Sequence, residues 1–259
     1  MYNHNYELND YDFVLYHLYT RNKRYNEYYK AMRRIHPDRI MILDNSAYEM
    51  FIKGETLNLE SYKNVIEELN PTYYILPDVL MDKDTTINDT KEFLSKYRPD
   101  CCSEPLAVVQ GNTAEELLEC MDIYKSMGIK NICIPFHNSF FKDSYDQTVC
   151  RQFKSIYNNI TNDIRYAAGR VSFVLDNIEK IRSFKYVHML GSHCPYEKCF
   201  YYDLDSMDTG YPVKLGLNNE KLGEESKKPE VIIDDFLDKP ISFTKRHLIE
   251  TNIRLFKTY

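Results

Sequence analysis

Short apolar segments alternate with longer amphipathic ones along most of this chain, and no other feature restricts its fold as strongly. Short apolar runs are typical of buried strands, and the segments between them carry apolar residues at helical spacing. The expected strands are 13–18, 40–45, 73–80, 106–111, 131–136 and 186–192, with a less regular seventh around 206–216. Strand and helix units repeated at intervals of about 25 to 35 residues predict a parallel sheet with right-handed crossovers.

The segments between the strands predict helices. Thr113, followed three residues later by Glu116, forms a capping box that opens a helix, and Gly128 closes it. Further helices are expected within the basic segment 21–34, over 57–69 and 82–97, and over 143–182 with a break near 161–163.

Two architectures accommodate this order, a closed (β/α)8 TIM-type barrel and an open doubly wound sheet. The sequence has neither a G-x-G-x-x-G string nor a P-loop, the usual signs of the open sheet. Polar residues stand at the carboxyl ends of the expected strands, where barrel enzymes keep their active sites, namely Asp44, Asp78, Gln110, Ser192 and Asp208. We therefore expect a single barrel domain over 1–259, completed by a helical segment from about 230 to 259.

Composition limits the partners and the compartment. The net charge of −6 argues weakly against nucleic acid, but the basic segments 21–34 and 239–259 suit either a phosphate-contacting or a merely solvated helix face. No apolar run reaches the roughly 18 residues of a membrane span, and the polar, acidic N-terminus predicts no targeting peptide. We expect a cytoplasmic protein whose seven cysteines are reduced thiols.

Carboxylates that meet at a barrel mouth suit chemistry at a sugar C1′ carbon. An oxocarbenium-like transition state needs one carboxylate as nucleophile and another to move protons, and Asp44 and Asp208 are the natural pair. A simpler interpretation is that an Asp at a strand end caps the following helix or turn. Asp44, followed by Asn45 and Ser46, is especially open to that interpretation.

Two other groups have competing interpretations. Asp78 and Gln110 together match the Watson–Crick edge of a guanine-like base, or form a structural polar pair. The histidines and cysteines of 188–199 invite a metal site, but Cys194 and Cys199 lack the spacing of zinc ligands, so no metal is expected. The sequence contains no G-x-S-x-G and no H-E-x-x-H, and therefore supports neither a serine hydrolase nor a zincin.

Five short segments, in order, resemble the tRNA-guanine transglycosylases, and most closely the short phage-type enzymes that install 7-deazaguanines in DNA. LDNSAYE resembles the family's D-S-G-G-F/Y-Q, and LAVVQG resembles its V-Q-G. HMLGS is similar to L-M-G-V-G, and MDTGYP to F-D-C-V-L-P. ILPDVLMD is similar to the segment whose aspartate pairs with the guanine edge. The five segments span residues 41–213, each at an expected strand end.

The resemblance implies a role for each matched residue. Asp208 falls on the nucleophile and Asp44 on the proton-transferring aspartate. The implied substrate contacts are stacking by Tyr48, base-edge pairing by Asp78, a grip on the base carbonyl by Gln110 and Gly111, and cover of the other base face by Leu190, or by Met189 if the register shifts by one. Ser46 and Gly191 complete the implied binding set.

The chain departs from the tRNA enzymes in three ways. Residues 217–259 contain no cysteine, so the family's C-x-C-x-x-C zinc subdomain is not expected. The Gly-Gly pair is Ser46-Ala47 here, and segment 131–136 lacks glycines, so main-chain contacts to the base fall loosely on Ile134 and Pro135. These differences favour DNA over tRNA as the substrate.

The first hypothesis is a phage-encoded DNA-guanine transglycosylase that acts in the host cytoplasm. It would exchange guanine for a preQ0-like 7-deazaguanine through a covalent aspartyl-glycosyl intermediate. The alternatives are the same exchange on tRNA, a hydrolase in which water intercepts the intermediate, and a non-catalytic barrel that binds a nucleobase or nucleic acid. The implied partners are DNA and a free base, without cofactor or membrane. The oligomeric state is open, a homodimer included.

Overall fold

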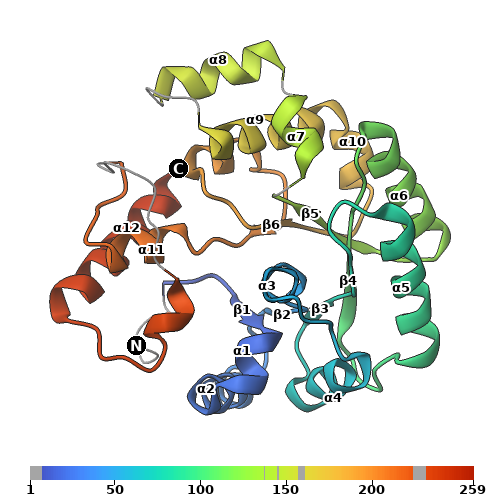
Figure 1. Cartoon of the computed structure of the whole chain (residues 1–259), viewed down its shortest axis with the longest axis horizontal. Helices are drawn as coiled ribbons and strands as arrows, with labels where there is room; N and C mark the ends of the chain where they lie inside the picture. The colour runs from blue at the N-terminus through green and yellow to red at the C-terminus, as the bar shows by residue number, and fades with distance from the viewer. Residues whose placement is uncertain (1–7, 137, 145, 157–160, 224–231) are drawn as a thin grey trace.

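A computed structural model describes residues 8–136, 138–144, 146–156, 161–223 and 232–259 (Figure 1). In these residues the strands form one seven-stranded sheet in sequential order, and every neighbouring pair is parallel. The strands are β1 (Asp12–Leu15), β2 (Met41–Asp44), β3 (Tyr73–Ile75), β4 (Glu104–Val108), β5 (Asn131–Pro135), β6 (Tyr186–Leu190) and β7 (Ser206–Met207). The predicted parallel sheet is confirmed.

The sheet is strongly curled, because rings from strands that are not neighbours touch inside it. Tyr73 of β3 stacks on Tyr186 of β6 with ring centroids 4.4 Å apart, and Phe13 of β1 stacks on His188 of β6 at 5.3 Å. Strands three and five places apart meet in this way only if the sheet bends around a common interior. The chain therefore has an α/β fold with a half-barrel of parallel strands, compatible with a TIM-like architecture.

Side chains alternate between the interior of the half-barrel and the helix layer outside it, as the pleat requires. On β6, Tyr186 belongs to the inner layer, whereas Val187 and Met189 pack with the helices. The buried inner layer consists of Ile42, Tyr73, Ile75, Leu106, Val108, Cys133 and Tyr186. Burial on both faces explains why the strands are continuous apolar runs rather than alternating ones.

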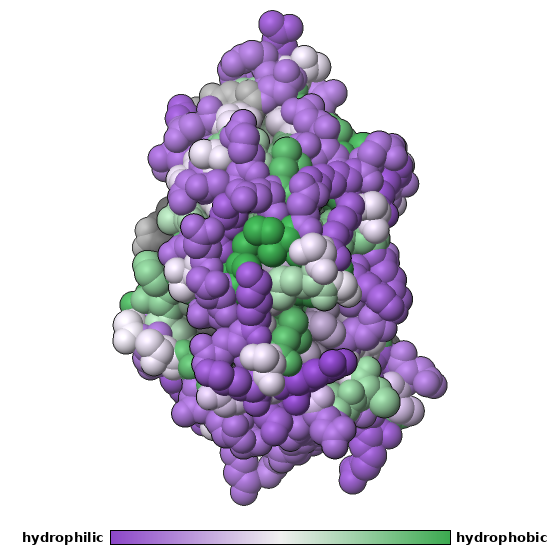
Figure 2. Space-filling view, turned by 90° about the vertical axis from the view of Figure 1, so that its right-hand side faces the viewer, coloured by the Kyte–Doolittle hydropathy of each residue, from purple (hydrophilic) through white to green (hydrophobic). Residues whose placement is uncertain are grey.

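The helices surround the sheet, and α3 is seen end on near the middle of Figure 1. The face that carries α5 and α6 is mostly hydrophilic, with a few hydrophobic residues near its middle (Figure 2). None of the described helices is long and apolar enough to span a membrane. The helices are α1 (Tyr16–Arg21), α2 (Lys23–Ile35), α3 (Ala47–Lys53), α4 (Leu59–Leu69), α5 (Lys83–Lys96), α6 (Ala114–Ser126), α7 (Ser139–Asp143), α8 (Gln147–Ile156), α9 (Asn162–Asp176), α10 (Ile178–Arg182), α11 (Tyr211–Leu217) and α12 (Phe243–Thr258), with the 3-10 turns η2 (Pro195–Phe200) and η3 (Ile233–Phe236).

Four expectations need correction. The expected strand 73–80 ends at Ile75, before Pro77. The first strand ends at Leu15 rather than at 18, because α1 starts directly at Tyr16. Residues 47–53, which were not expected to be helical, form α3. Of the expected strand at 206–216, only Ser206–Met207 pairs with β6, and the chain then enters α11 with a proline in its first turn, a position that needs no backbone N–H.

The C-terminal helix α12 packs closely on α11. A Cβ atom on Gly216 would lie 2.4 Å from Ile249 Cγ1 and 2.8 Å from the Ile249 backbone, so the two helices approach at a position that only glycine allows. Buried Asn252 accepts a hydrogen bond from Leu222 N at 2.8 Å and donates to the Glu220 carbonyl at 2.9 Å. The expected C-terminal helical segment is present as η3 and α12, and residues 230 and 231 lie outside the described ranges.

Replacing Gly216 with Ala tests this close approach. The added methyl group overpacks the contact with Ile249, and we expect it to lower the free energy of unfolding by about 1 to 3 kcal/mol, measured from urea denaturation. Ser95→Ala, at an exposed position of α5, serves as the control and is expected to change stability little. An unchanged midpoint for Gly216→Ala would contradict the packing of α12 on α11.

Candidate active site

Three aspartates meet at the carboxyl edge of the sheet. Asp44 is the last residue of β2, Asp78 follows β3, and Asp208 directly follows β7. The negative charges of Asp208 and Asp78 both help to raise the pKa of Asp44, and all three carboxylates raise the pKa of the buried Cys133 thiol in β5. The curl of the sheet thus brings residues from distant parts of the chain into one electrostatic environment.

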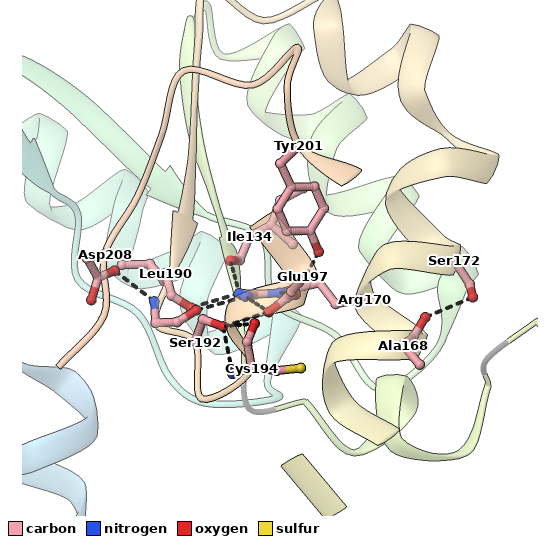
Figure 3. A network of polar contacts seen from close by, with 11 residues as sticks. Ile134, Ala168, Arg170, Ser172, Leu190, Ser192, Cys194, Glu197, Tyr201 and Asp208 are labelled. Carbon is pink, nitrogen blue, oxygen red and sulfur yellow. Dashed lines mark hydrogen bonds and ion pairs between the residues drawn. The ribbon is translucent and has the colours of Figure 1, made fainter. Parts of the chain in front are cut away.

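Asp208 is held through one oxygen by a residue of β6 and by the residue that follows this strand. Its Oδ1 accepts a hydrogen bond from Gly191 N at 2.7 Å and lies 3.1 Å from His188 Nε2 (Figure 3). His188 is fully buried, and its Nδ1 lies 2.7 Å from Ser206 Oγ. The Asp208 side chain keeps 23% of its surface exposed. The carboxylate is therefore both fixed in direction and accessible.

Asp44 is in a different environment. Burial is the main cause that raises its pKa, followed by the charge of Glu49, whereas Ser46 N, which donates to Asp44 Oδ2 at 2.8 Å, lowers it. Because neighbouring carboxylates repel a negative charge on Asp44 and few hydrogen-bond donors stabilise it, the protonated form is favoured. Asp44 is thus suited to hold a proton that an ordinary aspartic acid would have lost, and to release it when a neighbouring base takes it.

Asp78 is paired with two side-chain amides. Asn45 Nδ2 donates to its Oδ1 at 2.8 Å, and Gln110 Nε2 donates to its Oδ2 at 2.7 Å. Burial nevertheless raises the Asp78 pKa, against the lowering effect of both donors. Gln110 is only 1% exposed, and its Oε1 accepts from Met81 N at 2.9 Å. The structure thus contains the polar pair that the sequence allowed as an alternative to base recognition.

The two residues expected to cover the base, Tyr48 and Leu190, lie at or just beyond the carboxyl ends of different strands. Tyr48 is on α3, just beyond the end of β2, and is 43% exposed. Leu190, at the end of β6, packs against the inner layer, whereas Met189 is fully buried in the helix layer. Leu190 therefore remains a candidate for base contact, and the alternative assignment to Met189 does not fit the register.

Ser46 and Gly191 support aspartates. Ser46 has a left-handed backbone (φ 62°) and no exposed surface, and its hydroxyl oxygen lies 2.9 Å from His17 Nδ1. Its amide orients Asp44, as the Gly191 amide orients Asp208. The structure thus gives both residues a supporting position, which for buried Ser46 corrects the expectation of direct substrate contact.

Two residues expected to contact the base through the main chain, Gly111 and Ile134, have carbonyls that are bound within the protein. The Gly111 carbonyl accepts from Asn138 Nδ2 at 2.7 Å, and the Ile134 carbonyl accepts from Arg170 Nη1 at 3.3 Å. Pro135, next to Ile134, is the last residue of β5 and is buried. These contacts shape the edge of the sheet around the aspartates.

Sequence reasoning missed His188, Asn45 and Tyr11. The available signal for His188 was its place two residues before Leu190, which puts both on the inner face of one strand. Tyr11 makes an edge contact with His188 at 6.0 Å, and its buried hydroxyl has no hydrogen-bond partner among the described residues. Burial and then the charge of Asp208 raise the Tyr11 pKa, so this hydroxyl stays protonated on the inner side of the site.

The described residues contain no group of three or more His, Cys, Asp or Glu side chains placed to hold a metal ion. In comparisons with models of known protein families and with curated proteins, the chain matches none.

The raised pKa of Asp44 predicts a pH-dependent stability change in Asp44→Asn. Because the folded protein holds the Asp44 proton more tightly than the unfolded chain, ionisation costs stability as pH rises above about 4, the ordinary value for Asp. We expect the variant to be more stable than wild type at pH 7, by on the order of 1 kcal/mol, and the difference to vanish towards pH 3. Urea denaturation at both pH values measures it.

Asp82→Asn provides a control of opposite sign. Asp82 caps α5, and the Thr85 amide and hydroxyl lower the Asp82 pKa, so its contribution is present above about pH 4 and is lost in acid. This variant is expected to gain no stability at pH 7. If Asp44→Asn also gains no stability at pH 7, Asp44 does not have the raised pKa on which its proton-holding role depends.

Proposed function

We propose that the chain is a DNA-guanine transglycosylase that exchanges guanine for a 7-deazaguanine. One observation carries the proposal: Asp44 and Asp208 share an electrostatic environment at the carboxyl edge of the sheet, but only Asp208 is oriented by His188 of β6 together with the amide of Gly191, which follows that strand. Two carboxylates with different environments suit the two roles that glycosyl transfer requires. The resemblance of five segments to the transglycosylases is the reason for proposing guanine and 7-deazaguanine as the bases and DNA as the polymer.

In the proposed reaction, Asp208 attacks C1′ of the deoxyribose and the C1′–N9 bond of guanine breaks. Protonated Asp44 supplies a proton to the departing guanine, and Asp208 becomes esterified to the sugar. An incoming 7-deazaguanine then gives its N9 proton to the Asp44 carboxylate. Its nitrogen takes C1′ and releases Asp208, so that both aspartates return to their starting states.

The proposal also covers the complete barrel architecture and the choice of DNA as the substrate. The half-barrel would be part of a (β/α)8-type barrel, with the site at its mouth. DNA is favoured over tRNA because the matched segments resemble most closely the short phage-type enzymes that act on DNA. A base in duplex DNA must leave the stack before chemistry can occur at C1′, and the proposal assigns stacking on that base to the exposed ring of Tyr48.

Incorporation of radiolabelled guanine into duplex DNA, single-stranded DNA and tRNA, assayed side by side, tests the exchange. We expect label in DNA, and a covalent protein–DNA adduct on denaturing gels. Asp208→Asn is expected to lower both by more than about 10³-fold, because the nucleophile is lost. Asp205→Asn is the matched control, since Asp205 is exposed and accepts a hydrogen bond from Val187 N instead.

The outcomes separate the alternatives. Label in tRNA alone would replace DNA by tRNA as substrate, and release of free guanine without incorporation would indicate a hydrolase. If neither label uptake nor release nor adduct occurs with any polymer, the transglycosylase proposal fails and a binding barrel takes its place.

Tyr48→Ala tests base stacking. Stacking of one base on an aromatic ring contributes about 1 to 3 kcal/mol, so we expect the KM for the base or the DNA to rise by about 5- to 150-fold, with a smaller effect in Tyr48→Phe. Phe243→Ala removes a ring that is 84% exposed on α12 and controls for the loss of an exposed aromatic side chain. Equal KM values for Tyr48→Ala and wild type would exclude the stacking role.

A further inference from the structure

Beside the candidate site lies an ion pair without solvent contact. Arg170 on α9 and Glu197 on η2 are both 0% exposed, and Arg170 Nε and Nη2 donate to the two Glu197 oxygens at 2.6 and 2.9 Å. Tyr201 Oη and Ser192 Oγ complete the contacts of Glu197 at 2.7 and 2.9 Å. Buried charges are costly even when paired, and apolar side chains often replace such pairs without loss of stability. Stability alone is therefore a weak reason for this pair.

The guanidinium also binds the ends of two strands. Arg170 Nη1 donates to the carbonyl of Leu190 at 2.8 Å and, more weakly, to that of Ile134 at 3.3 Å, and Nη2 donates to the carbonyl of Gly191 at 2.7 Å (Figure 3). β5 and β6 end here, so these carbonyls lie beyond or at the last rungs of the ladder and need other donors. The rigid fork of an arginine supplies them from one side chain.

One of these contacts leads directly to Asp208. The Leu190 carbonyl and the Gly191 N–H belong to the same peptide unit, which is planar and trans, so the two groups point in opposite directions. Arg170 holds the carbonyl end at 2.8 Å, and the amide end donates to Asp208 Oδ1 at 2.7 Å. A cation on the carbonyl oxygen fixes the plane of the peptide and also polarises its N–H toward the carboxylate.

The same turn is held from the other side. Gly191 has a left-handed backbone (φ 63°), which turns the chain away from β6 immediately after Leu190. Thr209, next to Asp208, donates from Oγ1 to the Ser192 carbonyl at 2.6 Å. The segment 190–192 is thus fixed between Arg170 and the residues that follow β7, which leaves little freedom for the amide that meets Asp208.

We propose that Arg170 is a positioning residue for Asp208: held by Glu197, its guanidinium fixes the Leu190–Gly191 peptide, whose N–H sets the direction of the Asp208 carboxylate. The inference deepens the proposed function, in which Asp208 is the nucleophile. It assigns a role in the site to a side chain that itself contacts neither substrate nor the reacting atoms.

The test observes the Gly191 amide by NMR in a sample labelled with 13C-carbonyl leucine and 15N-glycine. Only the Leu-Gly pairs 190–191, 215–216 and 222–223 give coupled signals, so the other two serve as internal references. Arg170→Lys keeps the charge but loses the fork. We expect the Gly191 amide proton to move upfield and its hydrogen exchange to become faster by about tenfold, the factor that one lost hydrogen bond represents.

A second variant protects the test against loss of folding. This variant combines Arg170→Met, Glu197→Met and Tyr201→Phe, so that apolar groups replace the ion pair and its hydroxyl partner and no unpaired charge is buried. The same upfield shift and faster hydrogen exchange of the Gly191 amide are expected in it. Tyr201→Phe alone is the matched control, because it removes one hydrogen bond of the same network but none from Arg170 to a carbonyl. It is expected to leave the Gly191 signal unchanged.

The proposal is overturned if the Gly191 amide keeps its position and exchange rate in a folded Arg170 variant, or if Tyr201→Phe changes it equally. In the exchange assay, Arg170→Lys is expected to reduce kcat by about tenfold or more with an unchanged KM for the base, because the direction of Asp208 affects the chemical step. The NMR result requires no substrate. If wild type shows no base exchange, the proposed function fails while the spectrum still decides the role of Arg170.

Discussion

The arrangement of the site depends on the cost of keeping three carboxylates together at one edge of a parallel sheet. Parallel strands bring their carboxyl ends to the same side, so Asp44, Asp78 and Asp208 meet although 164 positions separate the first from the last. Burial and the neighbouring negative charges both oppose the ionisation of Asp44 and raise its pKa. Each surrounding polar group can be assigned to the carboxylate that it stabilises by a hydrogen bond. The three carboxylates differ in how many such hydrogen bonds they receive.

The compensation is uneven, and the unevenness distinguishes the aspartates. Asp78 receives two amide donors, and Asp208 receives a backbone amide and contacts an imidazole. Asp44 receives one backbone amide and faces Glu49 as well as the other two aspartates. Asp44, with few donors to stabilise its charge, retains its proton. Asp208, which accepts hydrogen bonds from fixed donors, keeps one orientation. Proton transfer and nucleophilic attack require these two different properties.

The sequence predicted the features that are determined by residues close together in the chain, namely the strands and the helix ends. The apolar runs predicted the strands because both faces of the sheet are buried, and Thr113 and Gly128 predicted the ends of α6 because caps are formed within a few residues. The failures also have physical causes. β7 pairs over two residues only, which leaves no periodicity to detect, and α3 is a short helix whose exposed Phe51 and Ile52 disguise its pattern.

The supporting residues of the site were beyond local prediction for another reason. Asp44 and Asp208 follow strands, so the sequence could place them at the edge. The roles of His188 and Arg170 depend on contacts with residues 18 or more positions away, such as His188 with Ser206 and Arg170 with Leu190. A buried arginine in a helix carries no sequence mark that separates it from a solvated one. Only the fold shows which carbonyls it meets.

The pairing of Asp78 with Gln110 connects these arguments to the proposed exchange. In the structure Gln110 donates one N–H to Asp78, and a carboxylate and a primary amide can each make further hydrogen bonds, so a guanine-like base can bind both while the Gln110–Asp78 hydrogen bond is kept. Each such bond to the base replaces one to water and contributes modestly, whereas a polar group that the bound base covers without pairing costs more. A base that lacks the amino donor would leave Asp78 buried and undercompensated. The pair would therefore discriminate between bases by the penalty for the wrong one, the kind of selectivity that buried polar groups provide.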